Sequence, residues 1–167
     1  MKCVKRSAAA LFVLVLVLTA GCSQKVNDHV VDYEVDVPSG FQSTEMDGVI
    51  ECWVSADGSN INVNTTDKTK DFNKIDADVL RDALMQVFQT TYGVEPTITD
   101  SYFTSDQVCG LPAYQYCYDI ELAGTEMTQL VVCVNADKTY TITYTDVTGD
   151  WMDEFEDSAK NIQLITE

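Results

Sequence analysis

The sequence predicts an α+β fold in which helices pack on an antiparallel sheet of about six to seven strands. Three observations support this class. After residue 30 the chain alternates apolar and acidic residues with a period of two, two later segments repeat apolar residues at helical spacing, and segments rich in Tyr, Val, Ile and Thr follow one another through short turns. Short links between successive strands favour antiparallel pairing as a meander.

The strands are expected wherever residues of high β-propensity lie between turn signals. Residues 31–37 alternate Val and Tyr with acids, and Pro38 follows them. Further strand-like segments lie on either side of the turn signal at 57–60, and then at 97–104, 113–122, 128–134 and 139–145.

Two helices are expected. Residues 76–92 place apolar side chains at i, i+3 and i+4, with Asp76 as the N-cap and Gly93 as the stop signal. The segment "DWMDEFEDSAKNI", residues 150–162, carries an apolar stripe behind acidic first turns. We expect Asp150 to cap this second helix.

Residues 1–21 have the pattern of a secretory signal peptide. A basic start precedes an apolar stretch of 13 residues, Ala8 to Ala20 with Thr19 near its end, shorter than the roughly 20 residues that a membrane-spanning helix needs. The stretch ends in Leu18-Thr19-Ala20-Gly21-Cys22, which resembles the bacterial lipobox. That resemblance implies a diacylglyceryl lipid on Cys22 and cleavage before it, so the lipid is the only attached group expected. A chance cysteine beside an ordinary cleavage site is the alternative.

The remaining chain is expected to form a short tether at 22–30 and one domain at 31–167. Loss of the leader removes three basic residues and leaves seven against 27 acidic ones, a net charge near −20. Such a charge excludes nucleic acid as a partner, and anionic membrane surfaces would repel the domain. Cations and basic peptides or proteins would be attracted, although the charge also serves solubility alone.

The order of these elements resembles the PsbP-like fold, which is shared by the photosystem II extrinsic protein PsbP and by many small bacterial lipoproteins. The stretches that carry the resemblance are "VDVPSGF", "GLPAYQY" and "TYTITYTDVTGDWMDEFEDSAKNI". It covers nearly all of the chain after the leader and implies a sandwich of helices on the sheet. These are structural signatures, so the resemblance transfers no functional residue.

Beyond the leader, which contains Cys3, four cysteines besides Cys22 remain and allow three disulfide pairings. If residues 123–127 form the turn between two strands, Cys117 lies opposite Cys133, with both on the face away from the tyrosines. We therefore expect a cross-strand disulfide between Cys117 and Cys133, and export permits it. Cys52 is expected as a buried apolar residue, and Cys109, in a turn, is its only remaining partner.

Acids gather near the C-terminus, and Asp146, Asp150, Asp153 and Glu154 are weak candidates for a divalent-cation site. The calcium-loop pattern is absent, so no metal site is predicted. Five tyrosines are expected as core under a helix: Tyr114, Tyr116, Tyr118, Tyr140 and Tyr144.

The only histidine, His29, lies in the expected tether, and no nucleophile has a visible base. The leading hypothesis is therefore a non-catalytic binding or accessory module of the cell envelope, anchored by lipid to the outer side of the membrane. A cation-binding accessory protein that uses the acidic C-terminal segment is the alternative. A hydrolase with paired carboxylates is the third and weakest hypothesis.

Overall fold

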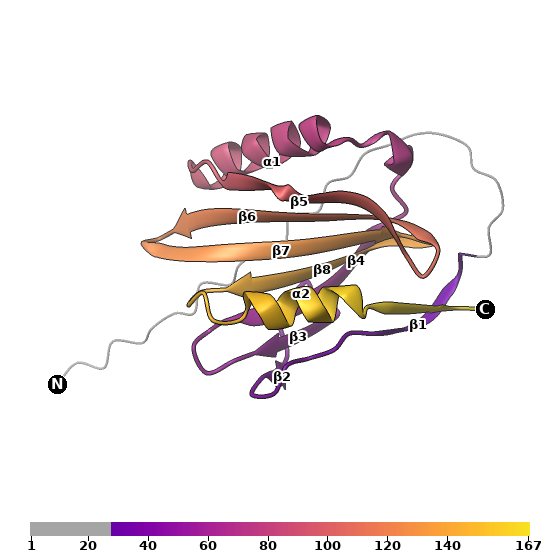
Figure 1. The fold of residues 1–167 in the computed structure, drawn as a ribbon, viewed down its shortest axis with the longest axis horizontal. Coiled ribbons are helices and arrows are strands. Elements are labelled where there is room, and N and C mark those ends of the chain that lie inside the picture. Colours follow the sequence, from indigo (N-terminus) through magenta and orange to yellow (C-terminus); the bar gives the residue numbers. More distant parts are fainter. Residues whose placement is uncertain (1–27) are drawn as a thin grey trace.

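The computed structural model describes residues 28–167, with the backbone alone for 99–107. The leader, Cys22 and most of the expected tether therefore lie outside the described residues. A seven-stranded antiparallel sheet forms the middle layer, with helix α1 on one face and helix α2 with a two-stranded ribbon on the other (Figure 1). The predicted α+β class, with two main helices on an antiparallel sheet, is confirmed.

The sheet order is β2-β3-β4-β8-β7-β6-β5, and the ribbon pairs β1 with β9. No helix in the described part of the chain is long and apolar enough to cross a bilayer. The strands are β1 (Val30–Glu34), β2 (Gln42–Thr44), β3 (Glu51–Val54), β4 (Asn60–Asp67), β5 (Thr97–Val108), β6 (Leu111–Leu122), β7 (Thr125–Asn135), β8 (Lys138–Asp146) and β9 (Gln163–Thr166). The helices are the 3-10 turn η1 (Phe72–Lys74), α1 (Ala77–Tyr92) and α2 (Met152–Lys160).

Helix α1 begins and ends where the sequence predicts. The Asp76 carboxylate accepts a hydrogen bond from the Val79 amide at 2.9 Å, and Gly93 adopts the left-handed conformation (φ 70°) that ends the helix. Leu80, Leu84 and Phe88 point into the core. On the sheet they meet Tyr116, Tyr118, Ile120, Met127 and Val131, which defines the α1 face.

The opposite, α2 face holds the larger part of the core. Phe155, Ala159 and Ile162 form the predicted apolar stripe of the second helical segment and are buried against Leu130, Ile142 and Tyr144 among others. The rings of Trp151 and Phe41 pack edge-on, with centroids 4.8 Å apart, and close this layer near the start of α2. Burying these large aromatic and aliphatic side chains supplies most of the favourable energy of this half.

The β6–β7 hairpin is tighter than predicted. The chain turns at Ala123 and Gly124, both with positive φ (54° and 81°), and Leu122 pairs directly with Thr125. The five-residue turn expected at 123–127 is therefore wrong. Every pairing in the hairpin is shifted by an odd number of residues relative to the prediction, and an odd shift exchanges the two faces of one strand.

This register removes the geometric basis of the Cys117–Cys133 disulfide. Cys117 pairs with Leu130 and belongs to the α2 face, whereas Cys133 pairs with Tyr114 and belongs to the α1 face. Both thiols are free in the structure, as are those of Cys52 and Cys109.

The five tyrosines are buried as predicted, but they divide between the faces. Tyr114, Tyr116 and Tyr118 face α1, and Cys133 lies on their side of the sheet. Tyr140 and Tyr144 belong to the α2 layer, where the Tyr144 and Ser158 hydroxyls are 3.0 Å apart.

The molecule has two distinct ends (Figure 1). One end holds Asp28, the β7–β8 turn and Glu167, and we call it the terminal end. There the Asp137 amide donates to the Asp28 carbonyl, and the Glu167 amide donates to the His29 carbonyl. The other, the hairpin end, holds the Ala123–Gly124 turn, the end of β8 at Asp146 and the C-terminus of α1.

Candidate functional site

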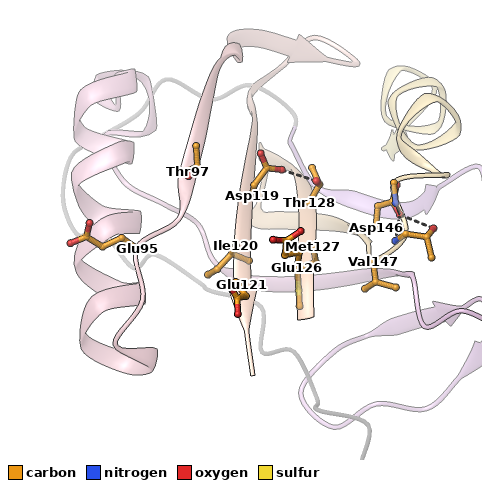
Figure 2. A pocket seen from close by; sticks show the side chains of 12 residues that line it. Glu95, Thr97, Asp119, Ile120, Glu121, Glu126, Met127, Thr128, Asp146 and Val147 are labelled. Carbon is orange, nitrogen blue, oxygen red and sulfur yellow. Dashed lines mark hydrogen bonds between the residues drawn. The ribbon is translucent and has the colours of Figure 1, made fainter. Parts of the chain in front are cut away.

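An open depression of about 570 Å³ lies at the hairpin end. It surrounds residues 119–121 and 126–128, the parts of β6 and β7 next to their turn, and extends to the end of β8 and the segment after α1 (Figure 2). Five carboxylates line it and no basic side chain does. The lining acids are Glu95, Asp119, Glu121, Glu126 and Asp146.

Antiparallel pairing concentrates three of these acids on one short ladder. Glu121 lies directly opposite Glu126, and two residues along the hairpin Asp119 lies opposite Thr128. The Thr128 hydroxyl donates to the Asp119 carboxylate at 2.6 Å (Figure 2). Like charges opposite each other in a sheet oppose pairing, so the exposed Glu121–Glu126 pair costs stability and attracts positive charge.

Asp146 has a different role in the same depression. It is 1 % exposed, and its carboxylate accepts from the amides of Thr148 (3.0 Å), Gly149 (2.8 Å) and Trp151 (2.9 Å). A buried carboxylate with three amide donors holds the loop between β8 and α2 in shape. Its oxygens are thereby committed to the backbone.

The expected capping role of Asp150 is wrong. The N-cap position of α2 is Trp151, which makes no side-chain capping bond, and Asp150 is exposed. The aspartate that accepts the Trp151 amide is Asp146, five residues earlier along the chain. Asp146, Asp150, Asp153 and Glu154 are not brought into one cluster: among the residues that the structure describes, no group of three or more His, Cys, Asp or Glu is arranged to hold a metal ion.

A second aspartate ties the neighbouring turn to this loop. Asp57 accepts from the Ser55 hydroxyl, the Ser59 amide (2.7 Å) and the Trp151 indole N–H (2.8 Å). Partial desolvation raises the pKa of the exposed Asp57 carboxyl, but these hydrogen bonds outweigh it and lower the pKa to about 2. The Ser59 hydroxyl in turn accepts from the Val147 amide at 3.1 Å, so the β3–β4 turn braces the rim of the depression.

The remaining predicted residues lie elsewhere. His29 is at the terminal end, where its Nδ1 lies 3.0 Å from the Asp137 carboxylate, so the only imidazole of the chain is remote from the depression. Cys52 is buried on β3, as predicted, and Cys109 lies exposed in the β5–β6 turn. Three strands separate β3 from β6, roughly 19 Å at the usual ~4.8 Å spacing, which is far beyond disulfide reach.

The depression was not predicted, although the sequence contains a signal for it. In "DIELAGTEMT" acids alternate on both sides of Ala-Gly, and a two-residue turn there places them side by side on one face. Glu95 could not be found this way, because only the packing of α1 brings it to the same end.

Solved structures with the same architecture support this description of the fold. The solution structure of cyanobacterial PsbP (CyanoP) from Synechocystis sp. PCC 6803 matches with a TM-score of 0.61 at 14 % identity, over 80 % of this chain and 86 % of that one. LpqN, involved in cell envelope biogenesis of Mycobacterium tuberculosis, matches with a TM-score of 0.50 at 15 % identity, over 81 % and 83 %. A Bacteroides thetaiotaomicron structure matches with a TM-score of 0.50 at 13 % identity, over 81 % of this chain and 46 % of that chain.

This chain has a PsbP-like fold. The sequence itself matches no protein-family model and no curated protein. At identities of 13–15 % the structural likeness concerns the fold alone.

Proposed function

We propose that this protein is a cell-envelope lipoprotein: a non-catalytic binding module, anchored through lipid on Cys22 to the outer side of the membrane, that holds a basic protein or peptide at its acidic hairpin end. The observation that carries the binding part is the depression itself. It is open, lined by carboxylates and free of basic side chains, a combination that attracts positive charge at long range.

Two features favour binding over catalysis. The most buried carboxylate of the depression, Asp146, is held by backbone amides, and Asp119 accepts from Thr128. Paired-carboxylate hydrolysis needs two acids in one cleft with different protonation states, whereas here Glu121 and Glu126 are both exposed on the sheet surface.

Support for the anchoring part comes from the leader and the lipobox. One neighbour in fold, LpqN, is described as involved in cell envelope biogenesis, which agrees with a protein that works outside the cytoplasm. A lipid anchor of two or more acyl chains gives stable attachment.

Anchoring is tested by fractionating cells that carry Cys22→Ala. The variant is expected to lose membrane retention, whereas Cys109→Ala, a matched control at an exposed thiol, stays in the membrane fraction. Retention of Cys22→Ala at the wild-type level would contradict the anchor.

Binding is tested by cross-linking on intact cells and capture of the lipoprotein. Glu121→Gln/Glu126→Gln should lose a cross-linked partner of basic pI. The control Asp32→Asn/Glu34→Gln makes the same charge change at exposed positions on β1 and should keep it. If both variants capture the same partners in the same yield, the hairpin end is not the binding surface.

A further inference from the structure

Charge is divided unevenly between the two ends of the described domain. Lys68 follows the end of β4, Lys138 opens β8 opposite Asp67, and Lys70 and Lys74 lie between β4 and α1, so all four belong to the terminal end. Arg81 is in the N-terminal half of α1, and Lys160 is in the last turn of α2. None of the basic residues that the structure describes lies at the hairpin end.

The hairpin end is acidic throughout. The five carboxylates of the depression are joined by others in the adjoining β3–β4 turn and at the start of α2. These additional acids are Asp57, Asp150, Asp153 and Glu154.

At the terminal end, by contrast, several acids already have a cationic or imidazole partner. Asp28 pairs with Lys68, and Asp71 pairs with Lys74 at 2.9 Å. His29 lies 3.0 Å from Asp137. Asp67, Asp76 and Glu167 lie at this end too, so it keeps a small excess of acids. Lys70 and Lys138 are exposed, and this end is therefore the less acidic of the two and presents ammonium groups to its surroundings.

The chain reaches the described domain at this same, less acidic end. Asp28, the first described residue, contacts Lys68, and the segment from Cys22 to Asp28 is short and contains Lys25. A surface held near the anchor experiences the surface potential of an anionic membrane, which falls off within a Debye length, about 8 Å at physiological salt, whereas a distant surface does not.

We infer that the domain stands on an anionic membrane with the terminal end against the lipid headgroups and the acidic hairpin end pointing away. This inference rests on the lipid anchor proposed above. Lysines next to an anchor bind anionic headgroups, and the same headgroups repel the carboxylates of the other end. The partner surface of the terminal end is therefore the anionic bilayer, and the hairpin end stays open to a partner.

Energy transfer to the membrane tests this orientation. The native lipoprotein carries a fluorophore on an unnatural amino acid at exposed position 73, at the terminal end, or 125, at the hairpin end, and is reconstituted into vesicles with an acceptor-labelled lipid. In phosphatidylcholine mixed with phosphatidylglycerol, transfer from position 73 should exceed transfer from 125. The difference should shrink in pure phosphatidylcholine and at about 1 M salt, where the Debye length is about 3 Å.

Matched variants identify the groups responsible. Lys70→Gln/Lys138→Gln should reduce the difference in transfer between the two positions. Gln86→Glu/Gln89→Glu makes the net charge more negative by the same amount, on the exposed side of α1. This control should leave the difference in transfer unchanged. Equal transfer from both positions in anionic vesicles, or a difference that Lys70→Gln/Lys138→Gln leaves unchanged, would overturn the orientation. Failure of the protein to float with any vesicle would contradict the anchor itself and the orientation with it.

Discussion

Asp146 shows how a single buried carboxylate shapes the candidate site. Its three backbone amide donors fix the loop that leads from β8 into α2. Asp146→Asn keeps the shape but loses the charge, so we expect about 2 kcal/mol less stability to chemical unfolding. The control Asp150→Asn, at an exposed neighbour, should cost no more than about 0.5 kcal/mol. Equal effects would mean that Asp146 does not hold the loop.

Asp57 gives the domain an acid-sensitive contact. Its pKa is lowered to about 2 in the folded protein, against about 3.9 when unfolded. The stabilisation is therefore fully present above pH ~4 and is lost as the pH falls toward 2. Because the group is exposed and screened, we expect the contact to supply roughly 1 kcal/mol. Denaturant unfolding between pH 6 and pH 2 should show a shallower acid loss for Asp57→Asn, and parallel curves would contradict this account.

At the scale of elements, local signals predicted the helix α1 and failed for the hairpin. Asp76 and Gly93 mark the ends of α1 through short-range hydrogen bonding and backbone freedom, so a single sequence contains the information. Ala123 adopts a positive φ. Asn or Asp at this position would have been a recognisable signal for a two-residue turn, but Ala is not, so the sequence predicted a longer loop. The three-residue register error follows from that one residue.

The ribbon of β1 and β9 is a second feature that the sequence did not predict, because it depends on long-range pairing. Its two strands come from opposite ends of the described chain, and the short "QLIT" segment carries no pattern that identifies its partner. The acids of the depression likewise come from separate elements, and only tertiary packing assembles them. The acidic charge as a whole was evident from composition, whereas its concentration at one end was not.

The corrected register makes a prediction about thiol chemistry. Cys109 is exposed, whereas Cys52 and Cys117 are buried and burial raises the pKa of the Cys117 thiol to about 12. In the folded domain Cys109 should react quickly with Ellman's reagent and the half-buried Cys133 more slowly, whereas Cys52 and Cys117 should react only on unfolding. Cys109→Ser should remove the fast phase. A Cys117–Cys133 disulfide in a non-reducing peptide map would contradict the hairpin register.

At the scale of the whole molecule, the large negative charge attracts cations without forming a defined ion-binding site. The described carboxylates do not converge on a common point, and calcium needs six to eight oxygens in a shaped site. Calorimetry with calcium at physiological salt should therefore give no stoichiometric micromolar binding. A stoichiometric isotherm that disappears in Asp150→Asn would favour the cation-binding alternative.

The central claim is that this PsbP-like domain works as a lipid-anchored module of the cell envelope, and the N-terminus of the native protein tests it most directly. Mass spectrometry of the N-terminal peptide, from protein purified out of membranes, should find a chain that starts at Cys22 and carries diacylglyceryl on its sulfur. An N-terminus that retains residues 1–21, or an unmodified Cys22, would contradict the account.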